Sequence, residues 1–196
     1  VNDYNDGPNT SQENTTDFSD TATAAEEALL DPISGGSYEH FDVTQFDIVF
    51  DVDALTDEIY FDVVFGSEEY DEFVGSEFID PFGIYLNGVN IASFGGNPIN
   101  INHPDMADIP GTELDGVIDP FGSGQVMAFS GSVTPGTTGN TLTFIVADTS
   151  DRFYDSTVFI SGFGDVPPSQ IPEPATLALF GIGLAGLGFV RRRKSA

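Results

Sequence analysis

Two segments in the first half of the chain alternate apolar and polar residues with a period of two. The apolar positions are Phe46, Ile48, Phe50 and Val52 in the first segment, and Ile59, Phe61, Val63 and Phe65 in the second. A period of two places alternate side chains on one face of a β-strand, whereas an amphipathic helix repeats every 3.6 residues. The sequence therefore predicts two half-buried strands here.

Turn signals extend this pattern along the chain. Asn87-Gly88 predicts a type I′ hairpin between strands at 84–86 and 89–91. Further strands are expected at 125–130, 141–147 and 157–161, with a long irregular connection over the Gly-, Pro- and Asn-rich residues 95–124. One short helix is expected at 21–30, capped by Asp20. The predicted fold is all-β, an antiparallel β-sandwich of jelly-roll type.

Charge is distributed very unevenly. The chain has 32 acidic and 5 basic residues, and Arg152 is the single base before residue 191. Such a surface repels phosphates, so we expect no nucleic-acid partner. The chain has no cysteine, which excludes disulfides and thiol catalysis. A hydrophobic fraction of 40%, with 18 phenylalanines, supplies a core and argues against disorder.

The C-terminal end has three parts. A Pro-rich linker, 165–174, ends in Pro172, Glu173 and Pro174; apolar or small residues then fill 175–190. Arg191, Arg192, Arg193 and Lys194 begin the last segment, 191–196. A helix over 175–190 would rise ~24 Å, and snorkelling arginines can close part of the gap to a hydrocarbon core of ~30 Å. We expect a transmembrane helix with a basic cytoplasmic tail; its four glycines argue against a buried soluble helix.

This tail resembles the PEP-CTERM sorting signal in the order, spacing and position of its parts. The resemblance implies recognition by exosortase, a membrane-embedded cysteine protease or transpeptidase of Gram-negative bacteria that make exopolysaccharide. It implies an exported protein, held in the inner membrane before processing and then placed at the cell surface or outside the cell. The chain opens with VNDYNDGPNT, without the apolar segment of a signal peptide, so we expect a trimmed or truncated start.

Two stretches of the body, VVFGSEEYDEFVGSEFIDPFGIYLNGVNIA and FIVADTSDRFYDSTVFISGF, resemble the choice-of-anchor L domain. The likeness covers residues 38–164, with 1–37 as an earlier, truncated part of the domain. Pro81 departs from the family pattern. The resemblance implies a surface-exposed domain that occurs with several anchoring signals, and it brings no reaction and no ligand residues.

The same two stretches concentrate carboxylates beside predicted strands. Ca²⁺ takes six to eight oxygen ligands, and adjacent acids repel one another without a cation. The candidate calcium ligands are Glu68, Glu69, Asp71, Glu72 and Asp80 from the first stretch, and Asp148, Asp151 and Asp155 from the second. A solvated acidic surface explains the same pattern, so both interpretations stay open. The interleaved aromatics Tyr70, Phe73, Phe78 and Phe82 are expected to pack rather than to form a sugar platform.

The sequence predicts a binding or structural role rather than catalysis. His40 and His103 stand without a nucleophile motif, and Arg152 either pairs with an acid or holds a substrate carboxylate. We expect a non-enzymatic surface, matrix or adhesion protein. Its expected partners are exosortase, the membrane, and exopolysaccharide or surface proteins. The alternative is a secreted glycan hydrolase that uses a pair of carboxylates.

Overall fold

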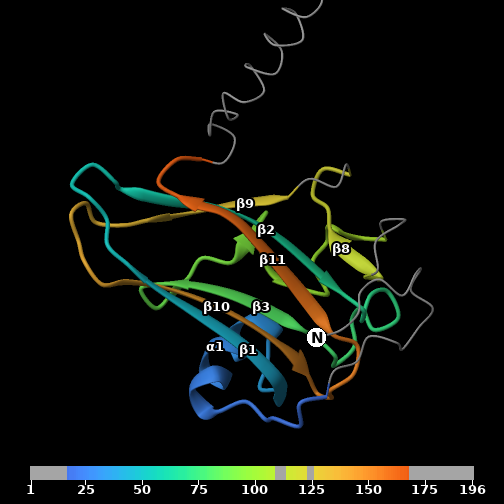
Figure 1. The fold of residues 1–196 in the computed structure, drawn as a ribbon. Helices are drawn as coiled ribbons and strands as arrows, with labels where there is room; N and C mark the ends of the chain where they lie inside the picture. Colours follow the sequence, from blue (N-terminus) through green and yellow to red (C-terminus); the bar gives the residue numbers. More distant parts are fainter. Residues whose placement is uncertain (1–16, 109–113, 123–125, 168–196) are drawn as a thin grey trace, which may run out of the picture.

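Two antiparallel sheets lie face to face in the computed structural model, which describes residues 17–108, 114–122 and 126–167 (Figure 1). The first sheet runs in the order β1-β10-β3-β6-β5, with β4 beside β3. The second runs β11-β2-β8-β7, with β9 also beside β2. The first-sheet strands are β1 (His40–Phe50), β3 (Pro81–Leu86), β4 (Val89–Asn90), β5 (Ser93–Phe94), β6 (Asn97–Asn100) and β10 (Asn140–Thr149). The second-sheet strands are β2 (Glu58–Ser67), β7 (Met106–Ala107), β8 (Gly116–Ile118), β9 (Met127–Ser132) and β11 (Ser156–Gly164).

The core fills the space between the sheets. All four apolar positions predicted for β2 are buried: Ile59, Phe61, Val63 and Phe65. They pack against side chains of β3 and β10 in the opposite sheet, including Phe82 and Phe144. The period-two pattern thus places one face of β2 in the core, and the predicted antiparallel β-sandwich is confirmed. Its assignment to the jelly rolls stays a prediction.

One helix, α1 (Ala24–Ser34), covers the outer face of the first sheet (Figure 1). Leu30 and Ile33 pack there against Tyr85 and Ile145. The helix begins later than the sequence suggested because Thr23, not Asp20, is its N-cap, in a capping box with Glu26.

The predicted hairpin is confirmed, whereas the predicted irregular connection is wrong in part. Asn87 and Gly88 both have positive φ, 49° and 80°, as a type I′ turn requires, and they join β3 to β4. The described part of residues 95–124 holds three short strands, β6, β7 and β8. Strands of two to four residues are too short for a periodic signal, so only the pairing of β6 with β3, of β8 with β2 and of β7 with β8 reveals them.

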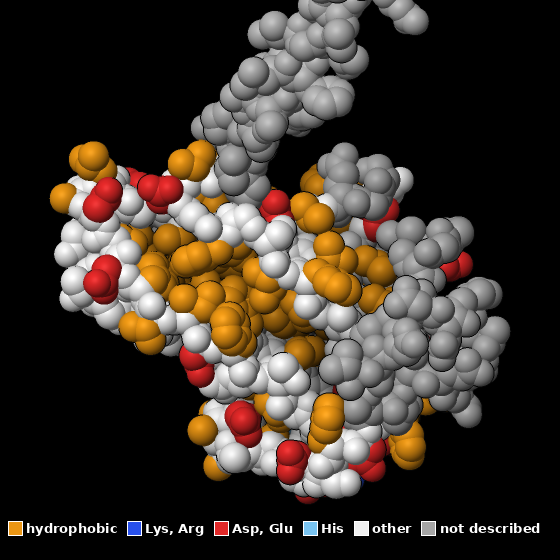
Figure 2. Space-filling model, in the orientation of Figure 1, with side chains coloured by type: hydrophobic (Ala, Val, Ile, Leu, Met, Phe, Trp, Pro, Cys, Tyr) orange, Lys and Arg blue, Asp and Glu red, His pale blue; other side chains and the backbone are white. Residues whose placement is uncertain are grey.

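The sandwich is open along the side where β1 and β11 form the edges of the two sheets. Phe46 was expected to face the core, but it is 60% exposed. Val49, Phe159 and Phe163 along the same edges are also exposed. Figure 2 shows hydrophobic side chains gathered between the two sheets on this face. An edge strand can alternate perfectly and still lack a neighbour that covers it.

Several expected segments lie outside the described residues: 1–16, the Pro-Glu-Pro motif, the membrane helix 175–190 and the basic tail 191–196. Within the described ranges, no helix combines the length and the apolar character needed to cross a bilayer.

Candidate functional site

Strand pairing brings the two acid-rich stretches to one end of the sandwich. The first stretch connects β2 to β3, and the second connects β10 to β11. Because β10 pairs with β3 and β11 pairs with β2, these connections lie side by side. The Glu68 amide donates a hydrogen bond of 3.2 Å to the Asp155 carbonyl and so joins them directly.

The eight predicted ligands divide by burial. Glu68, Glu69, Asp80 and Asp148 are 2%, 1%, 0% and 7% exposed. Asp151 and Asp155 are half-buried, and Asp71 and Glu72 are exposed. Carboxylates are almost never fully buried unless they are paired, so four buried acids in one region are unusual. We use the name acidic cluster for the four acids that repel one another here, which are Glu69, Asp80, Asp148 and Asp151.

Hydrogen bonding differs sharply within the acidic cluster. Asp80 accepts from the Thr149 amide at 2.9 Å on Oδ1 and from the Ser156 hydroxyl at 2.8 Å on Oδ2. Asp151 accepts from the Phe153 amide at 3.0 Å. Both carboxylate oxygens of Glu69 are buried, and neither has a hydrogen-bond partner among the described residues. The sequence predicted that acids are concentrated in these two stretches, but it did not indicate that the Glu69 carboxylate is buried without a hydrogen-bond partner.

Burial and mutual repulsion raise the pKa values of these groups. Burial raises the pKa of Glu69 to about 8, and the charges of Asp151, Asp148 and Glu72 add to the shift. Burial, followed by the charge of Glu69, raises the pKa of Asp80, although its hydrogen bonds from Ser156 and Thr149 oppose the change. Burial, followed by the charge of Asp80, raises the pKa of Asp148. The acidic cluster thus shares one electrostatic environment.

Aromatic side chains hold the two connections together. Phe73 lies 5.3 Å from the ring centroid of Phe78 and 5.3 Å from that of Tyr154 in the other connection. Phe82 is buried in the core, and Tyr70 is half-buried against it. The expectation that these aromatics pack is confirmed.

Tyr70 depends on a glycine in β8. A Cβ atom added at Gly116 would lie 2.4 Å from Cγ of Tyr70, closer than side chains approach. We expect Gly116→Ala to displace the Tyr70 ring, and with it the adjoining Glu69, and to lower the free energy of unfolding by about 1–3 kcal/mol. Urea denaturation of the full chain measures this. Gly164→Ala is the control, because its new Cβ would meet nothing closer than 4.0 Å; equal losses from both variants would contradict the prediction.

Arg152 forms an ion pair with an acid, which was one of the two roles that the sequence suggested for it. Its Nε lies 3.8 Å from Oδ1 of Asp17, and its guanidinium lies 4.2 Å from the centroid of the Phe41 ring. It also donates to the Thr21 hydroxyl at 3.4 Å. The single base of the described chain is therefore engaged with the segment that precedes α1.

The sequence analysis missed two acids that adjoin this end. Asp42 contributes to the raised pKa of Asp148. Burial raises the pKa of Asp115 to about 6, with added repulsion from Glu72, Asp108 and Asp71. The exposed Asp71 and Glu72 thus also face Asp115, which lies in the region expected to be irregular. A lone acid in such a region offers no sequence signal.

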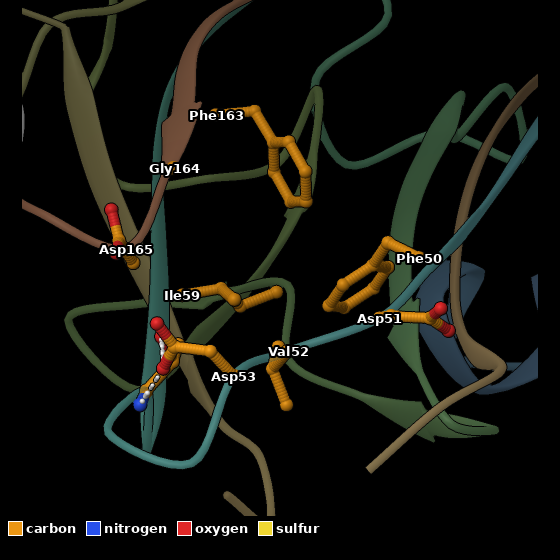
Figure 3. Close-up of a pocket in the computed structure, with 9 residues that line it drawn as sticks. Phe50, Asp51, Val52, Asp53, Ile59, Phe163, Gly164 and Asp165 are labelled. Carbon is orange, nitrogen blue, oxygen red and sulfur yellow. Dashed lines mark hydrogen bonds between the residues drawn. The ribbon is translucent and has the colours of Figure 1, made fainter. Parts of the chain in front are cut away.

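A pocket of about 340 Å³ opens at the other end of the β1 and β11 edges (Figure 3). Phe50 and Phe163 meet edge to face at 5.4 Å and form its wall. Asp51 accepts from the Gly139 amide at 2.8 Å, and Asp53 accepts from the Leu55 and Thr56 amides. The hydrogen bonds from Leu55 and Thr56 stabilise the turn that follows β1, and they lower the pKa of Asp53.

One tight group of possible metal ligands lies elsewhere in the described chain. Oxygen or nitrogen atoms of Glu27, Asp31 and His40 all lie within 4.8 Å of one another. His40 uses Nδ1 towards Glu27 at 2.6 Å and Nε2 towards the Ser34 hydroxyl at 3.2 Å. With both ring nitrogens engaged, we interpret the group as the anchor between α1 and β1.

Comparison with known families accounts for both parts of the chain. A model of the choice-of-anchor L domain matches residues 1–164, and a model of the PEP-CTERM protein-sorting motif matches residues 170–194. Neither a curated protein nor a solved structure matches the chain. The sorting motif indicates an exported protein that exosortase processes in the cell envelope.

Proposed function

Because the chain belongs to the choice-of-anchor L family, we propose that it is a non-catalytic surface or matrix protein that acts in adhesion. The observation that carries this proposal is the presence of a sorting motif and a surface-domain β-sandwich on one chain. In this proposal residues 175–190 hold the chain in the inner membrane, with Arg191–Lys194 on the cytoplasmic side. Exosortase then removes the tail, and the domain passes to the cell surface of a Gram-negative bacterium.

The charge of the domain favours one class of adhesion partner. Before residue 191 the chain has 32 acidic residues and one basic residue, Arg152. Arg152 is already paired with Asp17. A surface of this sign attracts basic groups and repels acidic ones. We therefore favour basic surface proteins as partners over an acidic exopolysaccharide.

The geometry gives less support to a glycan hydrolase. Such an enzyme needs one carboxylic acid with a raised pKa beside a second carboxylate at an open cleft. The described residues separate these features. No described acid with a raised pKa lines the pocket: Glu69, Asp80 and Asp148 are buried, and Asp62, Asp115 and Asp151 are half-buried elsewhere. The pKa of Asp53, which does line the pocket, is lowered. Glycan cleavage by the purified chain, lost on Asp51→Asn or Asp53→Asn, would instead favour the enzyme.

The sorting step is tested by replacing Pro172, Glu173 and Pro174 with alanine. We expect this variant to keep its tail in a host that carries exosortase, because the recognition motif is gone, while the parent chain is shortened. Immunoblotting with antibodies to the domain and to an epitope after Ala196 measures the change. The control replaces Pro167 and Pro168, which alters the same linker outside the motif and should leave processing intact.

The same strains test the role in adhesion. Cells with the uncut variant and cells without the protein should aggregate less than cells with the Pro167 and Pro168 control. Normal shortening of the alanine variant would overturn the sorting proposal. The adhesion proposal alone would be overturned by a different pair of results: the parent chain is shortened normally, and cells without the protein aggregate as much as cells with it.

A further inference from the structure

The acidic cluster contains a buried side chain that the fold leaves without a partner. Glu69 is 1% exposed, and both its oxygens lack a hydrogen bond among the described residues. Its neighbour Asp80 is 0% exposed but accepts two hydrogen bonds. Hydrogen bonding thus satisfies one buried acid and leaves the other with an uncompensated cost of burial.

No basic side chain of the described residues neutralises the acidic cluster. Arg152 lies over Phe41 and beside Asp17. His40 is bound to Glu27 and Ser34, and His103 lies 3.1 Å from the carbonyl of Phe94. The negative charges of Asp151, Asp148 and Glu72 repel a charged Glu69 carboxylate, so the surroundings of Glu69 add to the cost of burying its charge.

Protonation alone does not resolve the problem at Glu69. A protonated carboxyl group carries an O–H donor that needs an acceptor when it is buried. Neither Glu69 oxygen has a hydrogen-bond partner among the described residues. A neutral Glu69 would still lack a donor for its carbonyl oxygen, and its O–H group would depend on a neighbouring carboxylate as acceptor. A bound cation satisfies both the charge and the oxygen lone pairs.

We propose that Ca²⁺ binds in the acidic cluster, with Glu69, Asp148 and Asp151 as carboxylate ligands and Asp80 as a supporting charge. One feature favours Ca²⁺ over Mg²⁺. The carboxylates come from the β2–β3 connection, the end of β10 and the β10–β11 connection, and such a scattered set suits the flexible coordination of Ca²⁺ better than the near-ideal octahedron that Mg²⁺ demands. In this proposal, backbone carbonyls and water would complete the six to eight oxygens around the ion.

Binding must also draw the two connections together. Among the described residues, three acidic or histidine ligand atoms lie within 4.8 Å of one another only at Glu27, Asp31 and His40. The carboxylates of the acidic cluster are thus spread more widely than they would be around one ion. We infer that Ca²⁺ closes the β2–β3 connection onto the β10–β11 connection, where Phe73 already meets Tyr154. The proposed ligand set leaves out Asp71 and Glu72, which are exposed.

The test uses the full chain freed of divalent cations by a chelator. Calorimetric titration with CaCl₂ at pH 8 should show one bound ion, and thermal melting should show a higher midpoint with Ca²⁺ than with chelator. Glu69→Gln keeps the size of the side chain and removes its charge, so its Ca²⁺ affinity should fall about tenfold or more. Glu77→Gln is the matched control, because this exposed acid lies in the same connection and should bind Ca²⁺ like the parent.

A reversal in stability separates this proposal from a merely structural role for Glu69. With chelator at pH 8, Glu69→Gln should melt at the same or a higher temperature than the parent, because a buried charge has been removed. With Ca²⁺ the order should reverse. Asp151→Asn, at a half-buried position, gives a second variant if Glu69→Gln does not fold. Absence of a calcium-dependent shift in the parent, an equal shift with MgCl₂, or equal affinities of the Glu69 and Glu77 variants would overturn the proposal.

Discussion

Phe61→Ala is expected to lower the free energy of unfolding by about 3–5 kcal/mol, among the largest effects of any single substitution in this fold. Phe61 is 0% exposed on β2. Its ring stacks on Phe129 of the same sheet at 6.0 Å and meets Phe144 of the opposite sheet edge to face at 5.7 Å. Alanine would leave a cavity between the sheets and remove both ring contacts. Urea denaturation of the full chain, followed by circular dichroism, measures the loss.

Phe159→Ala provides the matched control for this prediction. The same atoms are removed, but Phe159 lies on the edge strand β11 and is 59% exposed. Its substitution should change stability by no more than about 0.5 kcal/mol. If both variants lose the same stability, the core does not lie between the sheets as described.

The contrast between these two phenylalanines shows how far the sequence predicts the fold. The alternation of β2 identified Phe61 correctly, because a strand at the centre of its sheet is flanked on both sides and covered on one face. The alternation of β1 was equally regular, yet Phe46 is exposed. Periodicity reports which side chains share a face of a strand, and it carries no information on whether another strand covers that face.

The sequence indicated which two stretches contain the acids of the candidate site, but it did not indicate which of those acids are buried. Two acid-rich stretches beside strands were enough to place Glu69, Asp80, Asp148 and Asp151 in one region. Their separation from Asp71 and Glu72 depends on the pairing of β10 with β3 and of β11 with β2, which joins residues about 70 positions apart, as in the bond from Thr149 to Asp80. Local sequence cannot specify such pairing, so it cannot distinguish a buried acid from a solvated one.

Loss of stability with rising pH is the second large effect that we expect. Without divalent cations, the free energy of unfolding should fall as the pH rises from about 5 to about 8. The cause is the pKa of Glu69, raised by burial and then by Asp151, Asp148 and Glu72 from 4.5 to about 8. The pKa values of Asp80 and Asp148 are raised in the same way. In this interval the folded chain binds protons that the unfolded chain has released. The stabilisation is therefore complete below the unfolded pKa of about 4 and is lost as the pH approaches the folded pKa.

The slope should be on the order of 1.4 kcal/mol per pH unit for each proton that only the folded chain retains. Acids with lowered pKa values, such as Asp47, Asp53 and Glu58, change their protonation below this interval and so do not offset the slope. Urea denaturation at half-unit steps of pH, with a chelator present, measures it. Glu69→Gln removes one of the titrating groups, so its slope should be shallower than that of the parent, whereas Glu77→Gln should leave the slope unchanged. A parent curve that is flat or rises between pH 5 and pH 8 would show that the acidic cluster is already ionised and solvated in the folded chain.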